Sequence, residues 1–121
     1  MTVANNDIYV VNTNSGTVSI IDHVTYNVIK TVSVGNTPIA ITTLKHATNP
    51  LYDKVYVTNA VSGTVSMIDP SNNNAVSSPI TVGAWPVSMT TANGKLYVSN
   101  ASSGTVSVIN GTTVEKTLTL A

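Results

Sequence analysis

A run of five residues, Ser-Gly-Thr-Val-Ser, occurs three times in this 121-residue chain, at 15–19, 62–66 and 103–107. Each copy follows a short aromatic and aliphatic run that ends in Asn, and each precedes an aliphatic run that ends in Asp or Asn. The tyrosines of the upstream runs are 47 and 41 residues apart, and the longer spacing contains an insertion at 45–53. Repetition at this period is typical of arrays of small, similar structural units.

Each repeat predicts four short β-strands. The runs around the repeated residues are rich in Val, Ile, Thr and Tyr, which favour strands, and Asn, Ser and Gly mark the turns between them. Asn93-Gly94 is a strong hairpin signal. We predict twelve strands in an all-β fold, grouped into three four-stranded antiparallel units at about 1–34, 38–82 and 86–121. Pro79 falls in the fourth and outermost strand of the second unit, where a missing N–H is tolerated.

Four antiparallel strands per unit at this period are the pattern of β-propeller blades, which pack face to face around a ring. Two-sided burial explains the even alternation of Ser, Thr, Val and Ala. Three units would form one segment of such a ring and would leave an apolar face open at each end.

Composition argues against several functions. The chain has five Lys, no Arg, five acidic residues and no net charge, so it lacks the clustered positive charge that nucleic-acid binding requires. Cysteine is absent, which removes disulfides, thiolate metal sites and cysteine nucleophiles. We expect no membrane span, because no apolar run approaches about 18 residues. The first residues show no signal-peptide pattern.

Three segments together resemble the YVTN family of β-propeller repeats: Val55-Tyr56-Val57-Thr58-Asn59, Ser62-Gly63-Thr64-Val65-Ser66 and Gly83-Ala84-Trp85-Pro86. The resemblance covers nearly the whole chain, because three units match in order. It implies a location at the cell surface or envelope, as in archaeal surface-layer proteins, and a binding or structural role. It implies no catalytic residues. Rings in that family usually have seven blades, so three units depart from the pattern.

The open ends predict that the chain has partners. Either copies of the chain associate head to tail, with a dimer favoured, or further blades of a parent chain complete the ring. Ala121 falls at the repeat position of Gly35 and Gly83, and Met1 falls about six positions further on, which suits head-to-tail joining.

Trp85 is the most informative candidate for a binding residue, because it interrupts a turn that carries Thr37 one unit earlier. A large aromatic there would stack on a ligand or anchor a protein or carbohydrate partner, or else it would fill space between blades. The turns of the same end add further candidates for ligand or partner binding: Asn14, Asn36, Ser62 and Ser103.

No residues form a recognisable catalytic or metal-binding pattern. His23 and His46 are not at ligand spacing and are expected to be surface polar residues. Asp22 and Asp69 occupy equivalent strand ends and are expected to cap turns. The repeated serines lack a His and Asp arrangement for nucleophilic catalysis. We therefore expect no metal and no cofactor.

The favoured function is a non-enzymatic β-propeller module of the cell surface or envelope, acting as a structural scaffold or interaction surface. The alternative is part of a propeller enzyme, similar to lactonases or lyases, whose catalytic residues lie outside this chain. A DNA-binding propeller is disfavoured by the missing basic patch.

Overall fold

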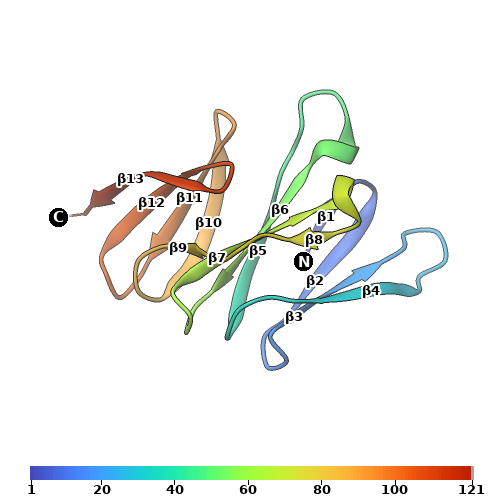
Figure 1. The fold of residues 1–121 in the computed structure, drawn as a ribbon, viewed down its shortest axis with the longest axis horizontal. Helices are drawn as coiled ribbons and strands as arrows, with labels where there is room; N and C mark the ends of the chain where they lie inside the picture. Colours follow the sequence, from blue (N-terminus) through green and yellow to red (C-terminus); the bar gives the residue numbers. More distant parts are fainter. Residues whose placement is uncertain (121) are drawn as a thin grey trace.

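The computed structural model describes residues 1–120, which form three antiparallel β-sheets standing side by side (Figure 1). The all-β, three-unit prediction is confirmed. The first sheet, sheet 1, consists of β1 (Thr2–Ala4), β2 (Asp7–Asn12), β3 (Thr17–Ile21) and β4 (Val28–Ser33).

Sheets 2 and 3 repeat this order along the chain. Sheet 2 consists of β5 (Pro38–Leu44), β6 (Lys54–Asn59), β7 (Thr64–Asp69), β8 (Ala75–Val76) and β9 (Ile80–Thr81). Sheet 3 consists of β10 (Pro86–Ala92), β11 (Lys95–Asn100), β12 (Thr105–Asn110) and β13 (Thr113–Thr119). Two single-turn 3₁₀ helices, η1 (Pro50–Tyr52) and η2 (Pro70–Asn72), lie in the loops of sheet 2.

The prediction that Pro79 falls within a single fourth strand of the second unit is wrong, because two short strands, β8 and β9, lie there and both pair with β7. Between them the Ser77 N–H donates to the Met67 carbonyl at 2.8 Å, and the Met67 N–H donates to the Ser77 hydroxyl at 3.2 Å. The Ser77 hydroxyl thus takes the place of the backbone carbonyl that would accept the Met67 N–H in a regular pair of antiparallel strands. Pro79 lies in the break rather than within a strand, and it has no N–H to continue the ladder.

The repeated residues build one hydrogen-bonded unit in each sheet. In sheet 2 the Asn59 amide Nδ2 donates to the Thr64 hydroxyl at 3.2 Å and to the Ser66 hydroxyl at 3.0 Å, which ties β6 to β7 next to their turn. Gly63 in that turn has φ +67°, a backbone conformation that favours glycine. Equivalent bonds are made by Asn12 and Asn100, to Thr17 and Ser19 and to Thr105 and Ser107.

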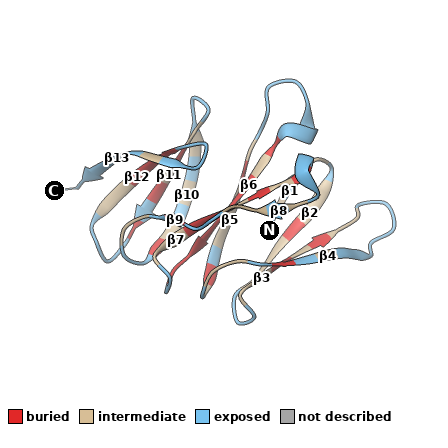
Figure 2. Ribbon diagram, in the orientation of Figure 1, coloured by how far each residue is buried: buried red, intermediate tan, exposed pale blue. Residues whose placement is uncertain are grey.

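Sheet 2 lies between the other two sheets, and each of its faces contributes to a separate apolar core (Figures 1 and 2). Tyr9, Val18 and Ile20 of sheet 1 pack with Val55 and Val57 of sheet 2. On the other side, Tyr56, Val65 and Ile80 of sheet 2 pack with Leu96, Val98 and Ile109 of sheet 3. The alternating side chains of β6 therefore serve two cores.

A tyrosine hydroxyl donates a hydrogen bond across each junction between neighbouring sheets. The Tyr9 hydroxyl donates to Asn74 Oδ1 at 2.5 Å, and the Tyr56 hydroxyl donates to the Gly111 carbonyl at 2.7 Å. Both acceptors lie between the third and fourth strands of the next sheet. The two junctions are therefore repeats of one interface.

Candidate functional site

The two ends of the sheets differ in charge. Of the residues that the structure describes, no formally charged side chain lies in the connections at the end that carries the Ser-Gly turns. We call this the neutral end, and it consists of residues 13–16, 34–37, 60–63, 82–85 and 101–104. The Lys, Asp and Glu side chains lie in the strands and in the loops of the opposite end.

Trp85 is the largest side chain of the neutral end, and 43% of its surface is exposed. Its φ is +56°, which is unfavourable for a residue with a bulky side chain. The Trp85 carbonyl accepts a hydrogen bond from the Ala101 N–H at 2.9 Å. Thr37 has the equivalent geometry one sheet earlier, with φ +57° and a 2.9 Å bond from the Ala60 N–H. The turn is therefore fixed by its backbone bonds and does not need an aromatic side chain.

The Trp85 side chain borders a shallow hollow of about 390 Å³ between sheets 2 and 3. Three segments form its walls: the turn 60–63, the connection 81–85 and Ser102. Ser62 lines the hollow, so the structure brings together two of the candidate residues. Sequence reasoning missed two exposed residues at its rim, Val61 and Ser102. Aligning the three turns would have found them, because both stand one position before the repeated serine.

The other candidate residues do not line this hollow. The Ser103 hydroxyl accepts from the Ala84 N–H at 2.6 Å, and the Ser62 hydroxyl accepts from the Asn36 N–H at 2.8 Å. These serines therefore hold each connection against the turn of the next sheet. Asn36 is exposed in that connection, and Asn14 lies exposed in the β2–β3 turn of sheet 1.

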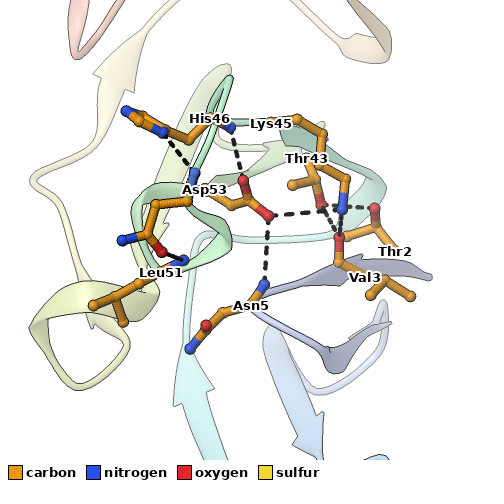
Figure 3. A network of polar contacts seen from close by, with 9 residues as sticks. Thr2, Val3, Asn5, Thr43, Lys45, His46, Leu51 and Asp53 are labelled. Carbon is orange, nitrogen blue, oxygen red and sulfur yellow. Dashed lines mark hydrogen bonds and ion pairs between the residues drawn. The ribbon is translucent and has the colours of Figure 1, made fainter.

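At the end of the sheets opposite the neutral end, Asp53 is the most deeply buried acid among the described residues, with 2% of its surface exposed (Figure 3). Its Oδ1 accepts from the His46 N–H at 2.7 Å, and its Oδ2 accepts from the Asn5 N–H at 3.4 Å. The Lys45 ammonium lies 3.7 Å from Oδ2 and also donates to the Val3 carbonyl at 2.8 Å. Asp53 thus joins the 45–53 insertion to sheet 1.

The equivalent acids Asp22 and Asp69 cap turns, as predicted. Asp22 Oδ1 accepts from the N–H groups of Val24 and Thr25, and these two bonds lower the pKa of its carboxyl. Asp69 Oδ1 accepts from the Ser71 N–H and from the Lys54 ammonium, each at 3.0 Å. Partial desolvation raises the pKa of Asp69, but the bonds from Ser71 and Lys54 outweigh it and lower the pKa overall.

Several other titratable groups of this end also have local partners. His46 Nδ1 accepts from the N–H groups of Thr48 and Asn49. His23 lies 4.0 Å from Asp7, whose pKa is raised by desolvation and by the nearby Asp22 charge. Lys95 pairs with Glu115 at 2.5 Å. Within residues 1–120 no three His, Asp or Glu side chains are grouped to hold a metal ion.

No helix in the described part of the chain is long and apolar enough to cross a membrane.

Solved structures with the same arrangement are propeller proteins. The chain is similar to Kuenenia stuttgartiensis hydrazine synthase, with a TM-score of 0.80 and 22% identity over 96% of this chain and 34% of that one. It is similar to the dihydro-heme d1 dehydrogenase NirN in complex with DHE, with a TM-score of 0.78 and 16% identity over 100% of this chain and 26% of that one. It is also similar to BBS1N in complex with ARL6DN, with a TM-score of 0.66 and 15% identity over 95% and 36%.

These likenesses establish a β-propeller architecture, in which the chain spans about a quarter to a third of the length of each matched structure. No protein-family model and no curated protein matches the chain.

The expectation that the chain is not an enzyme is wrong, because two of the matched structures, hydrazine synthase and the dehydrogenase, are enzymes. The expectation rested on the lack of a catalytic pattern among these residues, and such a pattern cannot show which proteins share the fold.

Proposed function

We propose that this chain is a three-sheet section of a closed β-propeller that belongs to an enzyme. In this proposal the section supplies the rigid frame and an interaction surface, and the catalytic groups lie outside this chain. The observation that carries the proposal is the outer face of sheet 3. Beside Lys95, Glu115 and Lys116, it presents a tyrosine and aliphatic side chains like those that sheet 2 buries against sheet 3.

Tyr97 occupies in β11 the position that Tyr56 occupies in β6. Tyr56 is 1% exposed and bonded to the next sheet, whereas Tyr97 is partly exposed and borders two hollows of the outer face. Val106, Val108 and Leu118 also line these hollows. Within residues 1–120 no sheet covers this largely apolar face, which supports a further sheet in the assembled protein.

The outer face of sheet 1 offers the complementary surface. Ile8 and Ile21 are directly paired across β2 and β3, as Val55 and Ile68 are across β6 and β7. Val55 and Ile68 are fully buried against sheet 1, whereas Ile8 and Ile21 are only partly buried. The two outer faces therefore match each other as the inner faces do.

The contacts of the acidic residues in this section support the proposal that catalysis occurs elsewhere in the protein. Asp22 and Asp69 cap turns, Asp53 holds the insertion and Glu115 pairs with Lys95, so these carboxylates already serve structural contacts. In the assembled enzyme, we expect amide substitution of Asp22 or Asp69 to change kcat per folded protein by less than about threefold. A hundredfold fall in kcat at unchanged melting temperature would place catalysis in this section instead.

Further sheets of a longer protein complete the ring in this proposal, and two isolated chains pair head to tail through the same faces. Membership of the YVTN repeat family and a location at the cell surface or envelope are part of the proposal. Both are supported by the three sequence runs around Tyr56, Gly63 and Trp85.

Sedimentation of the isolated chain tests the pairing. We expect a species at an integer multiple, two or more, of the 12.6 kDa chain mass. Leu118→Lys should weaken association at least about tenfold, because it places a charge in the outer face. Thr117→Lys adds the same charge to the neighbouring exposed position, outside the residues that line this face, and should leave association unchanged. A well-folded monomer at about 100 µM would contradict the head-to-tail pairing of isolated chains, because it would mean a dissociation constant well above this concentration.

A further inference from the structure

The backbone turn at Trp85 does not explain why a tryptophan stands there. Thr37 makes the same turn with the same backbone bond, so the fold does not require an aromatic at this position. A bulky residue at positive φ costs free energy, and with 43% of its surface exposed the indole recovers only part of the stabilisation that burial would give. An exposed, conformationally costly aromatic held by a fixed backbone is a feature of binding sites.

The hollow beside Trp85 has the mixed lining of a small-ligand site. Val61 and Ala84 give it apolar surface, and the hydroxyl groups of Ser62, Thr81 and Ser102 give it hydrogen-bonding groups. Its volume of about 390 Å³ falls in the range of ligand pockets, and its walls come from two different sheets. The walls are anchored by the bonds from Ala101 to Trp85 and from Ser102 to Ala84, at 2.9 and 3.1 Å.

The charge distribution selects the chemistry of the ligand. No side chain in the described connections of the neutral end is formally charged, so an anionic or cationic group bound there would lose water without gaining a counter-charge. An uncharged ligand with one apolar surface and several hydroxyl groups fits both the indole face and the serine and threonine hydroxyls. A neutral sugar ring has this combination, because its C–H groups lie on one face and its hydroxyls project from the edge.

We propose that the hollow between sheets 2 and 3 binds a neutral carbohydrate, with the C–H face of one sugar ring stacked on the Trp85 indole. The negative face of the indole attracts the weakly positive C–H groups of the sugar. Ser102 and Thr81 exchange hydrogen bonds with the sugar hydroxyls. Ser62 accepts from the Asn36 N–H and keeps its own O–H to donate.

Fluorescence titration tests this site directly, because Trp85 is the only tryptophan in the chain. The probes are neutral hexasaccharides: maltohexaose, cellohexaose, chitohexaose and mannohexaose. We expect at least one to shift the emission in a saturable way, with a dissociation constant in the range of about 0.1 to 10 mM that suits one stacked ring. A heparin hexasaccharide should give no saturable change.

Variants separate this site from unspecific binding, with calorimetry as the readout. Trp85→Thr installs the residue that Thr37 provides in the equivalent turn, so it should keep the melting temperature and lose binding at least about tenfold. Ser102→Ala should weaken binding about threefold. Asn14→Ala, at the equivalent turn position of sheet 1, should change nothing.

The absence of saturable binding by all four neutral probes up to about 10 mM would overturn the proposal. Undiminished binding by a folded Trp85→Thr variant would also overturn it. So would a preference for the heparin probe.

Discussion

The central hairpins of sheets 2 and 3 are built from similar sequences, yet the two sheets differ in what covers them. Tyr56 of β6 is 1% exposed, and its hydroxyl is bonded to Gly111 of the next sheet. Tyr97, at the same position of β11, is only partly buried on the outer face of sheet 3. The strand and its turn form in both sheets, so local sequence determines the sheet and the neighbouring sheet determines the burial. The following predictions test this difference.

The largest effect is expected at the buried asparagine of sheet 2. Asn59→Ala removes the bonds to Thr64 and Ser66 and leaves the Gly35 N–H without its 3.0 Å acceptor. It should lower the free energy of unfolding by about 3 kcal/mol, measured by urea denaturation.

Asn12→Ala is the matched control for Asn59, because it removes the same two strand-to-strand bonds in a partly exposed site of sheet 1. It should cost about 1 kcal/mol. Equal losses of unfolding free energy at the two positions would mean that the bond between Asn59 and Gly35, which joins sheets 1 and 2, adds no stability.

The next effect concerns two glycines, one constrained by close packing and the other by its positive φ. A Cβ on Gly35 would lie 2.5 Å from Asn59 Cγ, so Gly35→Ala should destabilise the chain by about 2 kcal/mol through overpacking. Gly104 has φ +65° and open space around it, so Gly104→Ala should cost only about 1 kcal/mol of backbone strain. Thermal unfolding of both variants checks the order, and a reversed order would contradict the close packing of sheets 1 and 2.

A smaller effect is expected from removing single hydroxyl groups. Tyr56→Phe deletes the bond to the Gly111 carbonyl and should cost about 1 kcal/mol in urea denaturation. Tyr97→Phe should change the stability of the dilute chain by less than about 0.5 kcal/mol. A larger loss for Tyr97 than for Tyr56 would show that the outer face is already engaged within one chain.

The pH dependence gives the last contrast. Burial raises the pKa of Tyr56 and Tyr9 above the ordinary tyrosine value near 10. Because the folded-state pKa is the higher one, the contribution of these tyrosines to stability should be constant below about pH 10 and should fall as the pH rises from there towards the folded-state pKa. Unfolding measured between about pH 9 and 11 should show this fall, and Tyr56→Phe should reduce it. A stability that rises in this range would contradict the burial of these hydroxyls.

The sequence predicted the sheets well because their determinants are local. Asn59, Gly63 and Thr64 lie within six residues of one another, and the turn that they specify recurs three times. The break at Ser77 was missed because a side-chain hydroxyl replaces a backbone carbonyl there, which strand propensity does not detect.

The candidate site could be predicted only in part. Trp85 stood out because it differs from Thr37, but its hollow depends on how sheets 2 and 3 meet. Ser62 and Ser103 were candidates because their turns lie at the same end as Trp85. Their hydroxyls, however, accept hydrogen bonds from backbone N–H groups of the preceding connection. These two pairings join residues 19 and 26 positions apart, and no local pattern shows them.

Native-state hydrogen exchange of the backbone amides tests most directly whether neighbouring sheets determine burial. In dilute solution, we expect the amides of β6 and β7 to exchange at least about tenfold more slowly than those of β11 and β12, because sheet 2 is covered on both faces. Raising the chain concentration should slow exchange in sheet 3 and narrow this gap. Equal protection of the two sheets in a dilute monomer would contradict the account.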